Sequence, residues 1–185
     1  FALGVFDLER ERWAEAHSWL QKAQPSKILD DYAALYRAQA GMELGEWEAA
    51  RDALTGKRFS GSTLAEDAQV LHAKVLARAG RPDTALQSLK AIPGFEKRAA
   101  LLFTYGEILA GADRGQEAIK VLRRVYFGFP LSTKAEPAKK VLLALRTEMG
   151  ESFPTAGVAL WRERAEYLWA ERAYIGARAA YQTLS

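Results

Sequence analysis

The sequence has no cysteine among its 185 residues. A disulfide, a thiolate nucleophile and a cysteine-based metal site are therefore all excluded. Both a periplasmic and a cytoplasmic location are compatible with this absence, because neither compartment requires cysteine.

Asparagine is also absent, and long apolar runs are missing. Without asparagine there can be no Asn-Gly turn, which is the strongest short signal of a β-hairpin. The longest apolar stretches, such as 141–145, are far shorter than the roughly 18 residues that a membrane-spanning helix needs. We therefore expect no insertion into a membrane.

The chain begins FALGVFDLER, with no methionine and no basic segment ahead of the apolar residues. This is not the pattern of a secretory signal peptide. We interpret the sequence as a fragment or as the mature part of a longer protein.

Charged residues are plentiful but nearly balanced in sign. The chain carries 26 Lys and Arg against 23 Asp and Glu, and its apolar share of 49% is typical of a folded domain. A net charge of +3 is weaker than nucleic-acid binding usually requires. Nucleic acid is therefore not an expected partner.

The clearest positive signal is a phrase that recurs around an alanine. Residues 43–54 read ELGEWEAARDAL, and residues 78–89 read RAGRPDTALQSL. The anchoring alanines, at spacings of 34, 35, 33 and 59 residues, are Ala16, Ala50, Ala85, Ala118 and Ala177. A period of this length indicates a repeat protein made of two-helix units.

Other residues recur at fixed distances in sequence from these anchoring alanines. Four residues after each anchor is Leu, except for Tyr181 in the last unit, and twelve before it is Gly or Ala. Small residues are needed where two helix backbones approach closely, and a large residue one turn on occupies the same helix face. Gly45 and Gly80 mark breaks between a first and a second helix, because glycine readily reverses the chain there.

The pattern predicts an all-α fold, a right-handed α-solenoid of antiparallel helix hairpins with about ten to eleven helices. The expected helices are 2–10, 12–23, 28–43, 46–55, 63–79, 82–91, 96–111, 114–128, 132–149, 156–170 and 173–184. The array covers 1–150 with an extra helix at 132–149, and an offset final hairpin at 151–185 continues the same solenoid. Ser62 or Thr63 with Glu66 is expected to form a capping box. A non-repeating helical bundle is the alternative.

This unit resembles the tetratricopeptide repeat, which has small residues at its eighth and twentieth positions and an aromatic residue near the seventeenth. Trp13 and Trp47 occupy that aromatic position here. The resemblance implies a concave surface lined by set positions of each first helix. Carried onto this sequence, these positions are Tyr32, Leu35, Gln39, Met42, Glu43, Asp67, Val70, Lys74, Arg78, Phe103, Glu107, Arg162, Glu166 and Trp169. Their mixed character suits a peptide or a protein partner, although the clamp that grips chaperone tails in some family members needs asparagine.

Three longer segments resemble the N-terminal superhelical region of soluble lytic murein transglycosylases. They are 28–47, 121–142 with its aromatic-Pro step, and 153–184 with its Pro-Thr start. The resemblance implies a periplasmic region that supports a C-terminal lysozyme-like domain, which cleaves peptidoglycan with one catalytic Glu. In that domain Glu-Ser precedes a Gly-Leu-Met-Gln stretch, whereas no such stretch follows Glu151 here. We therefore expect the scaffold without the enzyme, and interpret Glu151 as a linker residue.

No other constellation points to catalysis, a metal or a cofactor. His17 and His72 lie in helical stretches without an acidic residue three or four positions away. A metal site needs three or four converging ligands, so we interpret both as packed or surface residues. Neither a nucleophile elbow nor a phosphate-binding glycine loop is present.

Aromatic and basic residues leave two weaker options. Trp161 and Trp169 share one helix face, for which core packing is favoured over stacking on a sugar or a peptide. Basic pairs at 57–58, 97–98, 123–124 and 139–140 are interpreted as solvated faces rather than as a stripe for phosphates or the anionic cell wall.

Two functional hypotheses follow. The first is a non-catalytic scaffold, the superhelical region of a periplasmic peptidoglycan-cleaving enzyme, which grips glycan or its peptides and docks a catalytic domain. The second is a stand-alone repeat adaptor, for example in a cell-envelope assembly, that binds a protein or peptide partner on its concave face.

Overall fold

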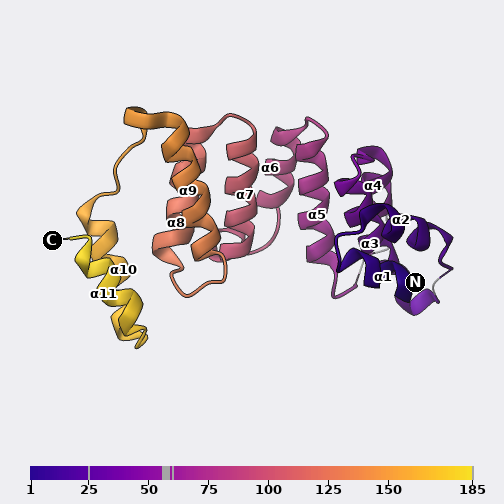
Figure 1. Cartoon of the computed structure of the whole chain (residues 1–185), viewed down its shortest axis with the longest axis horizontal. Coiled ribbons are helices and arrows are strands. Elements are labelled where there is room, and N and C mark those ends of the chain that lie inside the picture. The colour runs from indigo at the N-terminus through magenta and orange to yellow at the C-terminus, as the bar shows by residue number, and fades with distance from the viewer. Residues whose placement is uncertain (25, 56–58, 60, 185) are drawn as a thin grey trace. The chain divides into compact units, whose positions relative to one another are not determined.

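A computed structural model gives the fold of residues 1–24, 26–55, 59 and 61–184 (Figure 1). These residues form eleven α-helices and no β-strand, which confirms the predicted all-α class. None of these helices is long and apolar enough to span a membrane. The chain divides into two compact units, Phe1–Pro93 (unit 1) and Gly94–Ser185 (unit 2).

Unit 1 consists of three helix hairpins stacked in chain order. They are α1 (Ala2–Leu8) with α2 (Trp13–Lys22), α3 (Asp30–Glu43) with α4 (Trp47–Leu54), and α5 (Ala65–Arg78) with α6 (Pro82–Lys90), and the 3₁₀ turn η1 (Lys27–Leu29) precedes α3. The second helix of one hairpin contacts the first helix of the next, and the first helices contact one another in turn. This is the stacking expected of helical repeats.

Unit 2 holds two hairpins and one helix without a hairpin partner. The hairpins are α7 (Ala99–Gly111) with α8 (Gly115–Gly128), and α10 (Val158–Ala170) with α11 (Tyr174–Gln182). Between them lies α9 (Ala135–Met149), the extra helix that the spacing predicts, and the 3₁₀ turns η3 (Phe95–Lys97) and η4 (Gly150–Ser152) precede α7 and follow α9. Both α9 and α10 pack against α8, and a long connection joins them in Figure 1.

The repeated small residues lie where the two helices of each hairpin meet. All five anchoring alanines are at most 1% exposed, and the small residue twelve positions earlier is buried in every unit. A Cβ atom added to Gly4 or Gly106 would lie 2.6 Å from Leu20 Cγ or 2.7 Å from Leu122 Cγ, the leucine four residues after the anchor. The repeat spacing thus reflects one contact, between a small residue of the first helix and a large residue of the second, that recurs within the hairpins.

Every hairpin also turns at the same position, five residues before its anchor. There φ is positive: 57° at Glu11, 79° at Gly45, 76° at Gly80, 59° at Asp113 and 62° at Arg172. At all five turns this residue donates a backbone hydrogen bond three residues back, and the next residue donates one five residues back. This pair of bonds defines the Schellman motif, which closes a helix C-terminus. The two glycine breaks are confirmed, and three further turns make the same motif without glycine.

The capping box expected at the fifth helix is wrong. Helix α5 begins at Ala65, its N-cap is Leu64, and no side chain caps it. Instead the Ser62 hydroxyl accepts the Leu64 N–H at 3.1 Å and donates to the Asp31 carboxylate of α3. A serine side chain can bond the backbone two residues on as well as cap a helix. Here Ser62 makes the first kind of bond, and its hydroxyl is at the same time bonded to Asp31 of α3. That bond also lowers the pKa of Asp31.

Candidate functional site

The predicted face in unit 1 is carried by α3 and α5, which pack against each other. Helix α3 contributes Tyr32, which is 36% exposed, half-buried Gln39 and exposed Glu43. Helix α5 contributes exposed Asp67 and Arg78 and half-buried Lys74. The structure therefore brings charges of both signs together on two adjoining helices.

The predicted face in unit 2 is interrupted. Phe103 is only 7% exposed, and the Lys134 ammonium lies 5.5 Å from the centre of its ring. Its ring is therefore part of the packing between α7 and α9, and is not presented to a ligand. Glu107 of α7 is exposed.

On α10 the predicted residues Arg162, Glu166 and Trp169 are all exposed. Trp169 is 60% exposed and meets Tyr174 of α11 edge-on, with ring centres 5.1 Å apart. Trp161, on the same helix, is instead half-buried against α8. The two tryptophans therefore have different environments, although their spacing of eight places them on one helix face.

His17 makes structural contacts within unit 1. Its Nε2 lies 3.1 Å from Glu46 Oε2 and 2.5 Å from Gln21 Nε2, so it ties α2 to the start of α4. Glu46 is distant in sequence, which is why local spacing does not reveal this partner. No group of three or more His, Asp or Glu side chains in the described ranges is placed to hold a metal ion.

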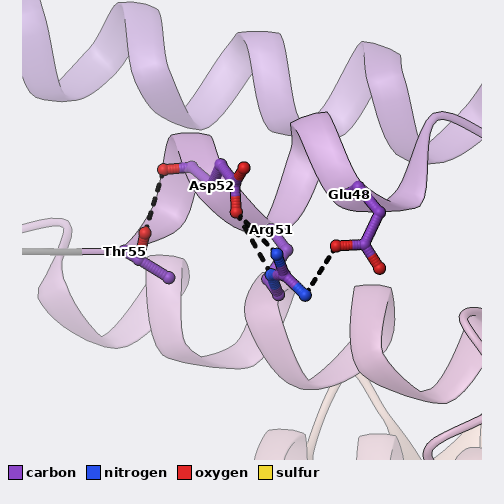
Figure 2. Close-up of polar contacts among 4 residues, drawn as sticks. All are labelled: Glu48, Arg51, Asp52 and Thr55. Atoms are coloured by element: carbon purple, nitrogen blue, oxygen red, sulfur yellow. Dashed lines mark hydrogen bonds and ion pairs between the residues drawn. The ribbon is translucent and has the colours of Figure 1, made fainter.

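His72 of α5 is influenced by a charged network on α4, shown in Figure 2. Arg51 lies between Glu48 and Asp52, at 2.6 Å and 2.9 Å from their carboxylate oxygens, and the hydrogen bond to Asp52 is the main reason that its pKa is raised. Burial, and to a smaller extent the positive charge of Arg51, lower the pKa of His72. This histidine therefore favours its neutral form in the folded protein.

A cleft in unit 2 is a candidate for ligand binding. It has a volume of about 580 Å³, within the range of known ligand sites. We call it the α8–α10 cleft, and it is lined by Arg123, Tyr126 and Phe127 of α8, Lys139, Leu142, Leu143 and Arg146 of α9, Gly150, Glu151, Phe153, Thr155 and Ala156 of the connection, and Trp161 of α10. It lies where α9, lacking a hairpin partner, and α10 both meet α8.

Aromatic rings form one wall of the cleft. The ring centre of Phe127 is 4.9 Å from that of Tyr126 and 5.0 Å from that of Trp161, in edge-to-face arrangements. Such contacts stabilise aromatic clusters beyond the area that they bury. The wall is therefore pre-formed, and because Tyr126 and Phe127 are each only 7% exposed, the half-buried Trp161 is the ring of this cluster with appreciable surface open to a ligand.

Arg164 of α10 packs against the Tyr126 ring of this wall. It is 7% exposed, donates a hydrogen bond to the carbonyl oxygen of Tyr126, and its guanidinium carbon lies 3.9 Å from the centre of the Tyr126 ring. Removal from water lowers the pKa of Arg164, and Tyr126 and Glu136 act in the opposite direction. A charged group is thus used to hold α10 against α8.

Three cations surround the apolar wall. Arg123 donates to the carbonyl oxygen of Pro154 and lies 5.3 Å from the centre of the Phe153 ring, and burial lowers its pKa. Lys139 lies 4.0 Å from a Glu136 oxygen. Arg146 is exposed and has no ion pair with any described residue. Because Glu151 is the single acid among the lining residues, the cleft carries a positive excess.

The connection between α9 and α10 supplies unpaired backbone to the cleft. Its chain is extended at Phe153 (φ −74°, ψ 118°) and at Gly157 (φ −66°, ψ 151°). Between them, Thr155 and Ala156 line the cleft, and their N–H and C=O groups make no backbone hydrogen bond to the described part of the chain. Thr155 is exposed and Ala156 half-buried, so their main-chain donors and acceptors are open to solvent beside the cleft.

Sequence reasoning finds only parts of this cleft. The pairs at 123–124 and 139–140 each contribute one cation to it, while the pair at 57–58 lies outside the described residues. Trp161 packs as predicted but also lines the cleft. The sequence signal that could have located the cleft is the interruption of the repeat period in unit 2. An unpaired helix followed by a Pro-containing connection leaves a gap in the regular stacking of hairpins.

Comparisons of this chain with protein-family models, with curated proteins and with solved structures found no match. The functional interpretation therefore depends on the chemistry of the cleft and of the exposed faces.

Proposed function

We propose that this chain is a non-catalytic helical-repeat interaction domain, and that the α8–α10 cleft is its principal binding site. The observation that carries the proposal is the meeting of an aromatic cluster with three cations in one cleft. Apolar surface with a few placed polar groups is typical of ligand sites. The repeated hairpins provide a scaffold on which such a site is held.

The resemblance to the superhelical region of lytic transglycosylases supports a periplasmic scaffold that binds peptidoglycan. The half-buried Trp161 ring offers apolar surface to a sugar, and cations attract the carboxylates of the cell-wall peptides. In this proposal the chain positions a C-terminal catalytic domain and holds its polymeric substrate, and has no catalytic residue of its own.

Co-sedimentation with purified peptidoglycan tests this proposal. Arg146→Glu reverses one cleft charge, and Lys140→Glu reverses an exposed neighbouring charge on α9 that does not line the cleft. We expect wild type and Lys140→Glu to sediment with the polymer and Arg146→Glu to remain largely in solution. Equal sedimentation of all three proteins would remove the cleft from the proposal.

A second candidate is an adaptor, periplasmic or cytoplasmic, that binds a protein partner through α3 and α5. It is favoured by the exposed charges of both signs on these helices, such as Asp67 and Arg78. Lys74→Glu with Arg78→Glu is expected to abolish capture of such a partner in a pull-down. The charge-matched control, Lys120→Glu with Lys140→Glu, alters exposed positions away from that face. Equal capture by both double variants would reject the face.

A further inference from the structure

We propose that the α8–α10 cleft recognises an extended peptide that carries carboxylates, and that Thr155 and Ala156 pair with the backbone of that peptide. This inference rests on the proposed function and adds the chemical class of the ligand. It draws on the unpaired main chain, the cations and the apolar wall, all of which line the cleft.

The unpaired main chain points to a peptide. Thr155 is exposed and Ala156 half-buried, so water satisfies their backbone groups in the free protein and a ligand can replace that water. An extended peptide offers alternating N–H and C=O groups and commonly binds by adding itself to an exposed extended segment. The connection, extended at Phe153 and Gly157, presents such a segment.

The cations point to carboxylates on that peptide. Arg146 has no acidic partner in the part of the chain that the structure describes, and Lys139 has only a distant one, Glu136 at 4.0 Å. A guanidinium binds a carboxylate in a paired geometry and loses little entropy in doing so. An anionic side chain or a free C-terminus of the peptide would therefore supply the carboxylate partner that these cations lack within the described part of the chain.

Helix geometry sets the spacing of the acidic groups. Arg146 lies seven residues after Lys139 on α9, which corresponds to a rise of about 10 Å. An extended peptide covers about 10 Å in three residues. We therefore expect the best ligands to carry two acidic groups about three residues apart, with an apolar side chain between them that packs on the half-buried ring of Trp161.

Phosphate chains fit the cleft less well. Nucleic acids bind where many cations follow the backbone in a row and few acids interrupt them. Here Glu151 lines the cleft, and Glu136 lies beside Lys139. A phosphate backbone also has no N–H donors for the carbonyl groups of Thr155 and Ala156.

The test is a calorimetric titration of the full chain with short synthetic peptides. The probe is an acetylated and amidated hexapeptide with Glu at its second and fifth positions and Leu between them. Its controls replace both Glu by Gln, or methylate a central backbone nitrogen. We expect binding by the Glu peptide and a loss of about tenfold or more with either control, since each removes one type of contact.

Protein variants show whether the cleft is responsible. Arg146→Glu is expected to weaken the Glu peptide by about tenfold or more, because it replaces an attraction with a repulsion. Lys140→Glu is expected to change affinity less than twofold. Equal binding of the Glu and Gln peptides, equal effects of the two variants, or displacement of the peptide by a short single-stranded oligonucleotide would each overturn the inference.

The source of the peptide is resolved by competition. Soluble muropeptides from purified cell wall carry the same carboxylate chemistry as an acidic segment of a protein. Displacement of the probe by muropeptides assigns the cleft to the cell wall, and failure to displace it assigns the cleft to a protein. If peptidoglycan binds while the Glu peptide does not, this inference fails and the proposed function stands. If neither binds, both fail.

Discussion

At the scale of single residues, the fold depends on a small residue facing a large one inside each hairpin. Gly106 sits where the side chain of Leu122 crosses from α8 to α7, and Leu122 is completely buried. Because interiors are close-packed, such a leucine has little room to move. The size of the residue at this position therefore controls how closely the two helices approach.

Gly106→Ala is expected to destabilise unit 2. The added Cβ would lie 2.7 Å from Leu122 Cγ, and overpacking of this kind costs about 1–3 kcal/mol. Gly111→Ala is the matched control, because a Cβ added at the end of α7 meets nothing within 4 Å. Chemical denaturation of both variants checks this prediction, which equal stability would contradict.

Arg172→Gly is expected to stabilise the turn between α10 and α11. Arg172 has φ of 62°, and a side chain in this left-handed region costs about 1 kcal/mol relative to glycine. We expect a gain of about 0.5–1 kcal/mol, and a smaller gain for Asp113→Gly, because aspartate tolerates this region better. Gly80→Ala should have the opposite sign. Thermal denaturation measures all three, and a loss of stability in Arg172→Gly would count against the turn geometry.

The turns show what residue types can and cannot predict. Gly45 and Gly80 can be predicted because glycine favours positive φ, whereas Glu11 and Arg172 adopt the same conformation without any such signal, and Asp113 gives only a weak one. Their position is set instead by the packing of the anchoring alanine five residues later. Periodicity therefore locates these turns even where composition does not.

At the scale of elements, two contacts between helices involve buried or half-buried basic side chains. His72 of α5 lies near Arg51 of α4 in unit 1, and Arg164 of α10 lies against Tyr126 of α8 in unit 2. Both pKa values are lowered mainly because the side chains are removed from water. The stability of these two helix contacts consequently depends on the charge of His72 and of Arg164.

Unit 1 is expected to lose stability in acid through His72. Its pKa in the folded protein is below the ordinary value of 6.5, so the unfolded chain takes up a proton more readily. The stability contributed by neutral His72 is complete above about pH 6.5 and is lost as the pH falls through the lowered folded pKa.

His72→Gln is expected to reduce this acid sensitivity, and Arg51→Gln to reduce it partly, because burial remains as the larger cause. Hydrogen exchange of the α5 amides between pH 7.5 and pH 5 measures the effect, after correction for intrinsic exchange rates. An unchanged pH dependence in His72→Gln would refute the role of this histidine.

Arg164→Ala is expected to loosen the packing of α10 on α8. It removes the cation over the Tyr126 ring and leaves the Tyr126 carbonyl without its donor. Losing such a buried partner costs about 1–3 kcal/mol. Faster hydrogen exchange in α10 and α11, with unit 1 unchanged, is the expected result, and Arg162→Ala on the exposed face is the control. Equal exchange in the two variants would contradict this role.

At the scale of the whole molecule, the repeat predicts all eleven helices found in the described residues, including the extra helix at 132–149, which forms α9. The α8–α10 cleft does not follow from the same pattern. It depends on the way α10 meets α8 and on the path of the connection through Phe153 and Thr155. These features arise where the period breaks, so regular spacing carries no information about them.

The binding face inferred from family positions extends over two adjoining helices in unit 1 but is interrupted in unit 2, and the reason is the same. In unit 1 the expected residues lie on adjoining helices, whereas in unit 2 the extra helix brings Lys134 over Phe103. An inserted helix changes which surfaces stay exposed without changing the repeat itself. The binding chemistry of unit 2 is therefore found in the cleft beside α9.

The central claim is that ligand binding occurs in this cleft. Two-dimensional NMR of the indole N–H groups tests it directly, because the five tryptophans lie in different environments and only Trp161 lines the cleft. On titration with the Glu hexapeptide or with soluble muropeptides, we predict a shift of the Trp161 signal that Arg146→Glu suppresses and Lys140→Glu preserves. Shifts confined to Trp13, Trp19, Trp47 or Trp169, with Trp161 unchanged, would contradict the assignment of the cleft as the binding site.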